Sequence, residues 1–342
     1  MRKQTVRFST KKVNYYFDTP FKEIKNLFEK EKIIIITDEN VYRYHTKKFN
    51  GFKVITIPAG EVHKHQQTVD NIISQLLHLQ ADKQTCIVGV GGGVVTDISG
   101  YIASIYKRGI KLALVPTSVL AMVDAAIGGK NGVDVGLYKN MVGTVYQPDV
   151  LLFDYSFLKT LPPEEWINGF AEIIKHACIK DAALFTFLAA NKIEKFKKDK
   201  TELAKLIEKN VAIKIAVVKN DEFETGERKL LNFGHTIGHA IENIYHLPHG
   251  HAVSIGMAAA CTISEKINNF YPEEKSMILD ILIQYQLPVK MDIDANKIWE
   301  VLLLDKKRDT DKMSFILLDR IGKAKIKSIS LKQLKSLMEE SL

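Results

Sequence analysis

The first part of the chain alternates short apolar runs with stretches of helical periodicity. Five runs predict strands: Lys32–Thr37, Phe52–Ile57, Thr85–Val90, Lys111–Val115 and Asp149–Phe153. Several are β-branched and apolar on both faces, which is typical of a parallel sheet covered on both sides. Helical patterns at Gln66–Leu79 and Val94–Tyr106 fall between some of them. This order predicts an α/β domain with a ligand crevice at the carboxyl ends of its strands.

The pattern changes near Thr160, where Pro162 and Pro163 precede two glutamates and signal the start of a helix. Beyond it, helical lengths dominate: residues 163–180, 182–190, 200–222, 228–246, 250–268, 272–286 and 295–304. Only Ser314–Leu318 and Ala324–Ile329 look extended. We therefore expect two domains, an α/β domain over residues 1–158 and a mostly α-helical domain over residues 159–342.

Bulk composition narrows the class of protein. The 342 residues are 46% hydrophobic and 26% charged, as expected of a globular protein. No apolar run approaches the roughly 18 residues that span a bilayer, and the N-terminus lacks the apolar core of a secretory signal. The cysteines Cys86, Cys178 and Cys261 are far apart and form no Cys-x-x-Cys pair. We expect a cytoplasmic protein without disulfides or membrane contact.

The formal net charge of +8 is compatible with nucleic acid, an anionic membrane surface or an anionic substrate. The lysines between Lys192 and Lys214 are spaced as on a solvated helix face. No basic stripe is interleaved with aromatic residues, as a single-strand binder would need. We therefore expect a small anionic substrate and no nucleic acid.

A glycine-rich turn, Val88–Asp97, follows a predicted strand and opens a helix. Glycines let the backbone approach a phosphate, and the helix N-terminus offers free N–H donors. It is not the usual dinucleotide fingerprint, because Val94 stands where the third glycine would be. Polar turns also follow two other strands, at Thr37–Asn40 and Ala59–Lys64. Three such turns in one sheet favour a dinucleotide over a turn without a ligand.

A polar stripe marks the predicted helix at 228–246. Arg228, Asn232, His235 and His239 stand at i, i+4, i+7 and i+11, which would place them on one helix face. Apolar residues normally align in this way, and a solvated face would carry lysine and glutamate instead. The stripe predicts the wall of a polar cavity.

Two histidines four residues apart, His235 and His239, can bind one metal ion. The zinc-protease pattern H-E-x-x-H is absent because Thr236 follows His235. A catalytic divalent site needs about three protein ligands and an open position. The remaining candidate ligands are His246, His249, His251, the carboxylate of Glu172 and its possible competitor His176.

A series of motifs runs through most of the chain in a fixed order: Gly60-Glu61 with Lys64, Gly91–Asp97, Lys107-Arg108-Gly109, Pro116-Thr117-Ser118, Asp124, Ile127–Lys130, Lys139-Asn140, Gln147-Pro148, Glu172 with Lys175, and Glu227–His239. With these motifs, the chain resembles the 3-dehydroquinate synthase family over roughly residues 30–330. The resemblance implies a nucleotide-binding α/β domain followed by a helical domain that binds a metal ion and the substrate.

The resemblance also implies site residues. A Zn²⁺ or Co²⁺ ion would be held by Glu172, His235 and His249, with His251 standing where the family usually has glutamate. NAD would lie near Asp38, Asn40, Glu61, Lys64, Gly92, Gly93, Val94, Asp97, Thr117, Ser118, Lys130, Lys139, Phe157 and Thr160. Substrate contacts and catalysis would involve Asp124, Lys130, Asn140, Lys175, Lys214, Glu224, Arg228, Asn232, His239 and Lys307. Arg108 resembles a residue that reaches into the partner subunit's site, so a homodimer is implied.

The implied reaction converts 3-deoxy-D-arabino-heptulosonate 7-phosphate to 3-dehydroquinate and phosphate in the shikimate pathway to chorismate. NAD transiently oxidises a ring hydroxyl, which acidifies the neighbouring C–H and permits β-elimination of phosphate. The hydride then returns, the ring opens and an intramolecular aldol closes the carbocycle. His239 suits proton transfer, and Lys130, Asn140 and Arg228 suit the phosphate.

Three alternatives remain open at the level of sequence. Another sugar phosphate cyclase, such as a 2-deoxy-scyllo-inosose synthase, would share the metal and NAD. A metal-dependent alcohol or glycerol dehydrogenase would release NADH and would need no phosphate-binding set. A catalytically dead NAD-binding regulator would not need the intact set of metal ligands.

Overall fold

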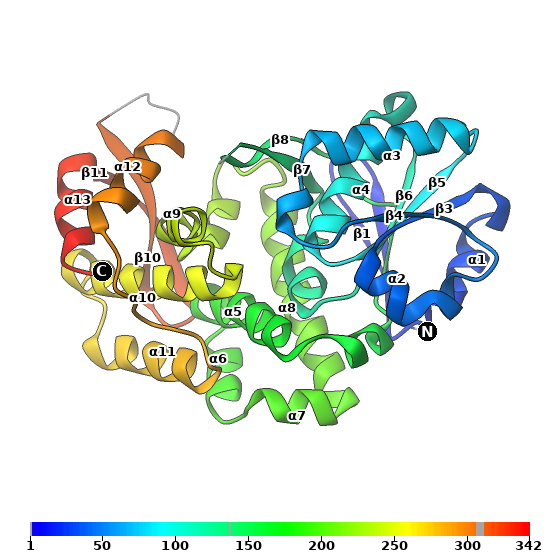
Figure 1. Cartoon of the computed structure of the whole chain (residues 1–342). Coiled ribbons are helices and arrows are strands. Elements are labelled where there is room, and N and C mark those ends of the chain that lie inside the picture. Colours follow the sequence, from blue (N-terminus) through cyan, green and yellow to red (C-terminus); the bar gives the residue numbers. More distant parts are fainter. Residues whose placement is uncertain (1, 137, 306–310) are drawn as a thin grey trace. The chain divides into compact units, whose positions relative to one another are not determined.

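The computed structural model describes residues 2–136, 138–305 and 311–342 (Figure 1). The chain forms two compact units. The first comprises Met1–Glu165 with Lys200–Phe223, and the second comprises Trp166–Asp199 with Glu224–Leu342. The predicted domains were continuous segments, 1–158 and 159–342. The units differ from them because the first unit also takes in helix α8 (Lys200–Asn220).

A seven-stranded sheet forms the centre of the first unit. Its order is β1-β2-β9-β6-β5-β3-β4, with bounds β1 Arg2–Arg7, β2 Lys12–Phe17, β3 Ile33–Asp38, β4 Lys53–Ile57, β5 Cys86–Gly91, β6 Lys111–Pro116 and β9 Val150–Leu152. All neighbours pair in parallel except β1 and β2. The predicted parallel sheet is therefore confirmed, and each of the five predicted strands forms within one or two residues of its expected bounds.

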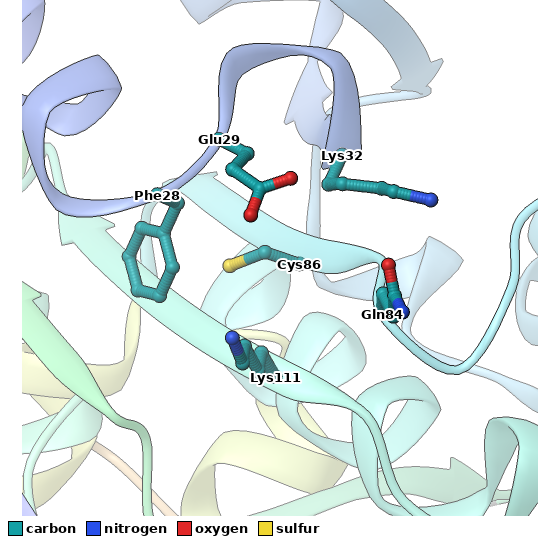
Figure 2. A pocket seen from close by; sticks show the side chains of 6 residues that line it. All are labelled: Phe28, Glu29, Lys32, Gln84, Cys86 and Lys111. Atoms are coloured by element: carbon teal, nitrogen blue, oxygen red, sulfur yellow. The ribbon is translucent and has the colours of Figure 1, made fainter.

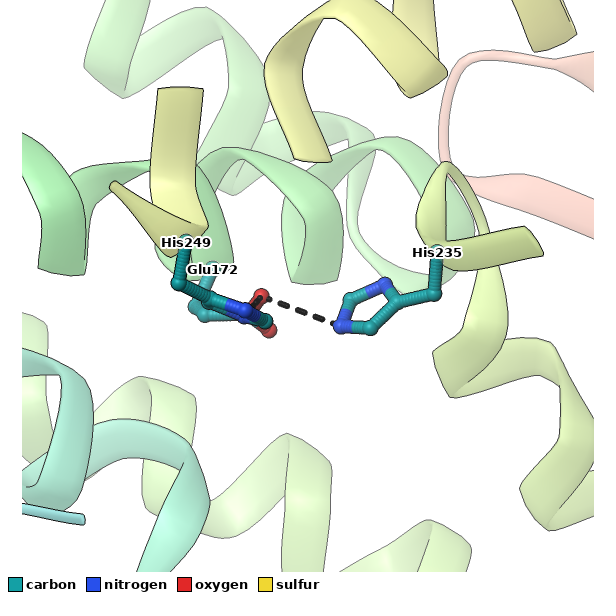
Figure 3. A group of neighbouring side chains, drawn as sticks. All are labelled: Glu172, His235 and His249. Atoms are coloured by element: carbon teal, nitrogen blue, oxygen red, sulfur yellow. Dashed lines mark hydrogen bonds and ion pairs between the residues drawn. The ribbon is translucent and has the colours of Figure 1, made fainter. Parts of the chain in front are cut away.

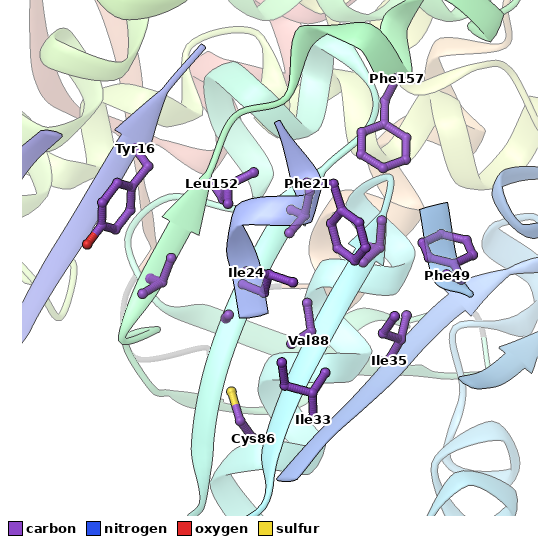
Figure 4. Packing of buried hydrophobic residues seen from close by; sticks show 14 residues of the cluster. Tyr16, Phe21, Ile24, Ile33, Ile35, Phe49, Cys86, Val88, Leu152 and Phe157 are labelled. Atoms are coloured by element: carbon purple, nitrogen blue, oxygen red, sulfur yellow. The ribbon is translucent and has the colours of Figure 1, made fainter. Parts of the chain in front are cut away.

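The core of this unit lies on both faces of the sheet, as the double-sided apolar pattern predicts. On one face, alternate residues such as Ile33, Ile35, Val88 and Leu152 join a buried cluster that Phe21 covers (Figure 4). Their neighbours in the strands point to the other face and are buried as well: Ile34, Ile36, Ile87, Leu112, Leu114 and Leu151.

Helices and a hairpin complete the first unit. The helices are α1 Ile24–Leu27, α2 Glu39–His45, α3 Gln66–His78, α4 Gly93–Ile105 and α8, with a π-helix at Ala121–Ala125. The hairpin of β7 (Lys130–Val135) and β8 (Tyr138–Val145) was not predicted, because its outer strand is mostly exposed and lacks a clear alternation. Single-turn π-helices occur often at functional sites.

The second unit is mostly helical, as predicted. It contains α5 Pro163–Lys180, α6 Ala182–Ala189, α7 Ile193–Lys198, α9 His235–Tyr245, α10 His249–Asn268, α11 Pro272–Gln284, α12 Ala295–Asp305 and α13 Leu331–Glu339. The two predicted extended segments form an antiparallel pair, β10 (Lys312–Arg320) and β11 (Lys323–Ser330). Helices α7 and α13 were not predicted. No helix in the described ranges is long and apolar enough to cross a membrane.

The prediction of one helix over 228–246 is wrong. A short 3-10 helix, Glu227–Asn232, ends before Phe233, and α9 starts only at His235. Between them Gly234 has a φ of 78°, the left-handed region that favours glycine. The turn lies tightly against α10, where a side chain on Gly234 would meet the Val253 carbonyl oxygen. Arg228 and Asn232 therefore do not share a helix face with the two histidines.

The α9–α10 contact provides a stability test, because Gly256 of α10 packs directly against the Gly234 carbonyl of the turn. Alanine is intrinsically better in a helix by about 1 kcal/mol. We nevertheless expect Gly256→Ala to lower the free energy of unfolding by about 1–3 kcal/mol, since its methyl group would overlap backbone atoms that cannot rotate away. Guanidinium unfolding measures this, with Thr262→Ala on the same helix as the control. An unchanged or higher stability for Gly256→Ala would contradict the packing.

Candidate active site

The strand order of the first unit reverses between β3 and β5, since the chain leaves β3 for β4 on one side and continues to β5 on the other. Such a reversal opens a crevice at the carboxyl ends of the two strands in open α/β sheets. The Thr37 hydroxyl donates a 2.7 Å hydrogen bond to the Val90 carbonyl and ties these two ends together. Asp38 ends β3 and the glycine turn follows β5, so these predicted cofactor residues lie at one edge of the sheet.

The glycine turn leads straight into α4, with Gly92 as the residue before the helix and Gly93 and Val94 in its first turn. No side chain among the described residues caps this N-terminus. Thr117 follows β6, and its N–H donates to the Gly91 carbonyl at 2.9 Å. Ser118 comes next and lies beside Gly92. Backbone donors and small hydroxyl side chains therefore gather where a phosphate can bind.

Asp38 also has a structural role that its sequence position did not indicate. Its carboxylate accepts hydrogen bonds from the N–H groups of Asn40 and Val41, at 3.0 and 2.9 Å, and caps α2.

Phe157 belongs to the buried core, and its ring contacts His45 edge-on. Thr160 accepts or donates a 2.7 Å hydrogen bond with the His45 Nε2 atom. The Phe157 side chain is therefore part of the hydrophobic core.

A buried lysine links three predicted cofactor and substrate segments. The Lys64 ammonium lies 2.6 Å from the Asp97 carboxylate and donates to the Asn140 amide oxygen at 2.6 Å. The Glu61 carboxylate lies 3.8 Å from both Lys64 and Lys139. Burial alone would lower the pKa of Lys64, but Asp97 and Glu61 outweigh it and raise that pKa. The loop after β4, helix α4 and the β7–β8 hairpin thus meet at a permanent positive charge.

A second ion pair, between a buried lysine and a half-buried aspartate, lies within the first unit. The Lys214 ammonium of α8 donates to the Asp124 carboxylate and to its backbone carbonyl, at 2.6 Å each. Asp124 sits in the π-helix, whose irregular turn brings its carbonyl within reach of the same lysine. This contact explains why α8 groups with the first unit. Lys130 begins β7 after two left-handed glycines, Gly128 and Gly129, and is exposed.

Arg108 lies in a different part of the first unit. It follows α4, which runs from the carboxyl end of β5 to the amino end of β6. It is exposed, and both it and Lys107 have left-handed backbones, with φ values of 60° and 47°. The Lys83 ammonium holds this turn by donating to the carbonyls of residues 107–109. Arg108 is therefore at the opposite edge of the sheet from the glycine turn.

The same amino-terminal edge carries a small pocket of about 290 Å³ (Figure 2). It is lined by Phe28, Glu29, Lys32, Gln84, Cys86 and Lys111. Cys86 and Lys111 begin β5 and β6, so this pocket lies away from the glycine turn. The Lys32 ammonium pairs with Asp82 at 2.7 Å, and burial raises the pKa of the Cys86 thiol. None of the predicted site residues lines it.

In the second unit, Glu172, His235 and His249 converge (Figure 3). The Nε2 atoms of His235 and His249 lie 3.4 and 3.3 Å from the same Glu172 oxygen, Oε1. The potential ligand atoms of the three residues all lie within 4.8 Å of one another. One carboxylate and two imidazoles match the donor set of a three-ligand catalytic zinc site.

The charges around this cluster differ between the two histidines. Burial opposes ionisation of Glu172, but Lys175, which pairs with it, and His235 hold its pKa well below the usual range. Burial and the Lys175 charge lower the pKa of His235 and keep its imidazole neutral near pH 7. Burial would do the same to His249, but hydrogen bonds with Glu172 and Glu242 raise its pKa to about 10. A metal ion binding His249 must displace that proton.

The other predicted residues of this unit take distinct positions. The His239 ring stands one turn after His235, with ring centroids 5.0 Å apart. Arg228 is buried in the 3-10 helix, and the Asn232 amide donates to the Glu224 carboxylate at 2.7 Å. His246 ends α9 in a left-handed conformation, and His251 is half-buried and outside the metal-capable groups found among the described residues. Lys307 lies outside the residues that the structure describes.

Sequence reasoning missed Glu242. This glutamate is 8% exposed, and its carboxylate contacts the Nδ1 atom of His249 at 3.2 Å. Its position seven residues after His235 and three after His239 would have placed it on the histidine face of α9.

Comparison with known proteins assigns the family. Residues 54–168 match the model of the 3-dehydroquinate synthase N-terminal domain, and residues 169–308 match that of its C-terminal domain. A 3-dehydroquinate synthase of Thermodesulfovibrio yellowstonii is 40% identical over 324 residues, 91% of this chain and 90% of that protein.

Two solved structures are similar along almost the whole chain. A 2-deoxy-scyllo-inosose synthase complexed with carbaglucose-6-phosphate, NAD⁺ and Co²⁺ is 25% identical, with a TM-score of 0.85 and 100% of both chains covered. The 2-epi-5-epi-valiolone synthase ValA of Streptomyces hygroscopicus subsp. jinggangensis, with NAD⁺ and Zn²⁺ bound, is also 25% identical, with a TM-score of 0.86 over 98% of this chain and 97% of that one. Identity is markedly higher to the dehydroquinate enzyme, and the chain belongs to the 3-dehydroquinate synthase family.

Proposed function

We propose that this chain converts 3-deoxy-D-arabino-heptulosonate 7-phosphate to 3-dehydroquinate and phosphate, as a lyase of the shikimate pathway. The observation that carries the proposal is the convergence of Glu172, His235 and His249 in a chain that belongs to this family. The buried, unpaired state of all three cysteines agrees with work in a reducing cytoplasm.

A Zn²⁺ or Co²⁺ ion is proposed to bind Glu172, His235 and His249. The donor set fits, and the two solved relatives carry one of these ions each. Such an ion would polarise substrate hydroxyls and stabilise a developing alkoxide. Lys175 contributes differently, because its ion pair keeps the Glu172 carboxylate ionised and ready to bind a cation.

NAD is proposed to bind at the carboxyl edge of the first unit's sheet. Both solved relatives contain NAD⁺, and it would supply the transient oxidant. The N–H groups of the Gly92–Val94 turn are proposed to bind the pyrophosphate, and the uncapped N-terminus of α4 and the neighbouring Lys64–Asp97 ion pair support this. Glu61 is suited to accept hydrogen bonds from ribose hydroxyls.

Within each unit, charged and amide side chains are assigned to the substrate. In the first unit, Lys130 and Asn140 are proposed to hold the phosphate, while the ion pair keeps Asp124 and Lys214 oriented. In the second unit, Arg228 can bind an anion through two parallel hydrogen bonds, and Glu224 fixes the Asn232 amide. His239, whose ring is packed against that of His235, is proposed to transfer a proton through an imidazole nitrogen.

A homodimer is proposed, in which Arg108 serves the site of the partner subunit. The position of Arg108 at the edge of the sheet opposite the glycine turn supports this, as does the rigid left-handed turn that projects it. Met141, Val142 and Val145 of β8 are exposed apolar residues on an edge strand, suited to contact another copy.

The direct test incubates the purified protein with Co²⁺ or Zn²⁺, catalytic NAD and the heptulosonate phosphate. We expect phosphate and 3-dehydroquinate in equal amounts and no accumulation of NADH, because the hydride returns to the product. Phosphate colorimetry and chromatography measure the two products. Absence of phosphate release sinks the proposal. Turnover of another sugar phosphate instead would indicate a different sugar phosphate cyclase, and stoichiometric NADH from a polyol would indicate a dehydrogenase.

The choice of the third metal ligand has its own test. We expect His249→Ala to lose the bound metal, because it removes one of three donors, and His251→Ala to retain it, because His251 stands outside the cluster. Metal content after gel filtration, measured by plasma emission spectroscopy, decides between them. The reverse result would make His251 the ligand.

Complementation between subunits tests the role of Arg108. Arg108→Ala and His239→Ala should each be nearly inactive alone. Co-expressed, they should form hybrid dimers in which one of the two sites has both groups intact, since each site takes its arginine from the partner. Recovery of phosphate release in the purified hybrid measures this. If Arg108 acts within its own chain, no hybrid site is complete and activity stays absent.

A further inference from the structure

Glu242 is a buried carboxylate with no role in the function proposed above. It lies on α9, 8% exposed, and its Oε2 atom is 3.2 Å from the Nδ1 atom of His249. Burying a carboxylate is costly unless a charge or hydrogen-bond donor compensates it, so this contact is one that the fold maintains.

The helix geometry explains why Glu242 faces the metal cluster. His235, His239 and Glu242 stand at i, i+4 and i+7 of α9 and share one face. That face meets the first turn of α10, where His249 lies. The two helices approach closely because glycines occupy their contact, with Gly238 against the backbone of Ala252 and Gly256 against Gly234. Glu242 is thereby held at a fixed distance from the His249 ring.

The two ring nitrogens of His249 face different partners. Nε2 lies 3.3 Å from the Glu172 oxygen on which His235 also converges, whereas Nδ1 faces Glu242. A neutral imidazole carries its proton on one nitrogen and a lone pair on the other. A carboxylate that accepts the Nδ1–H leaves the Nε2 lone pair for a cation and fixes the plane of the ring.

We infer that Glu242 is a positioning residue of the metal centre, which accepts the Nδ1–H of His249 and aims its Nε2 atom at the ion. The inference rests on the proposed function only in that Glu172, His235 and His249 bind a divalent cation. Glu242 is thus assigned no direct contact with the ion or the substrate.

A competing arrangement would use Glu242 itself as a ligand. Potential ligand atoms of His239, Glu242 and His249 also lie within 4.8 Å of one another. The convergence of two Nε2 atoms on one Glu172 oxygen favours the first arrangement. The two differ in what they require of His235, which belongs only to the first.

The test measures Co²⁺ affinity by chelator competition, and the visible absorption of the Co²⁺-loaded protein, without substrate. Glu242→Ala should bind Co²⁺ about 10–100-fold more weakly and change the absorption bands, because the His249 ring is no longer fixed. Glu242→Gln should lose less, since its amide oxygen still accepts a hydrogen bond. Glu265→Ala is the matched control, because it removes the same charge from α10 about 24 Å along the helix from His249 and should leave affinity and spectrum unchanged.

Three results would overturn the inference. Unchanged affinity and spectrum in Glu242→Ala would remove any role at the metal centre, and equal losses in Glu265→Ala would reduce the effect to net charge. Retention of Co²⁺ by His235→Ala, with its loss in Glu242→Ala, would make Glu242 a ligand. If Glu242→Ala does not fold, Glu242→Gln and Glu242→Asp are measured instead. Wild-type Co²⁺ affinity and spectrum in both variants would contradict the inference. A wild-type protein that binds Co²⁺ but releases no phosphate would contradict the proposed reaction and would leave the inference about Glu242 unaffected.

Discussion

The buried carboxylate of Glu172 is the constraint on which the second unit depends. The residue is 0% exposed, and an ionised carboxylate without partners would be too costly to bury. Its compensation comes from Lys175 one turn along α5 and from histidines on α9 and α10. Three helices must therefore meet at one point, which requires the close α9–α10 contact that glycines permit. The charge compensation of Glu172 therefore requires the close packing of these three helices.

The first unit uses the same principle with the opposite sign. Lys64 is almost completely buried, and its partners come from α4 and from the β7–β8 hairpin. The hairpin makes a further link, since the Asp134 N–H donates to the Lys64 carbonyl and the Asp134 carboxylate accepts from Asn140. An apolar core could hold these segments together without specifying their register. A buried charge with directional partners holds the segments together and also fixes their register, which a site for polar ligands needs.

The sequence predicts the elements whose hydrophobic residues follow a clear periodicity, and it does not predict features that tertiary contacts determine. The runs that form β3, β5 and β6 are apolar on both faces. The same residues therefore predict the strands and the parallel sheet that is covered on both sides. The polar residues from Arg228 to His239 have the spacing of one helix face, but the chain turns at Gly234. Only the tertiary contact of Gly234 with α10 explains this turn. Glu242 was overlooked because an acidic residue on a helix is ordinarily exposed. The place of α8 in the first unit depends on the Lys214–Asp124 pair, which joins residues 90 positions apart.

The fold narrows the chemistry less than the site does. Two relatives that share the fold at TM-scores of 0.85 and 0.86 are named for different cyclisation products, and each contains NAD⁺ and a divalent ion. The metal-capable cluster therefore cannot by itself distinguish one cyclase from another. Discrimination must come from groups that contact the parts of the substrate that differ. Among the residues proposed to contact the substrate, the buried Arg228 and the Glu224-oriented Asn232 have fixed positions, which permits recognition by hydrogen-bond geometry as well as by charge. A site built on oriented donors rejects a substrate that leaves them unpaired, because a buried polar group without a partner costs about 1–3 kcal/mol.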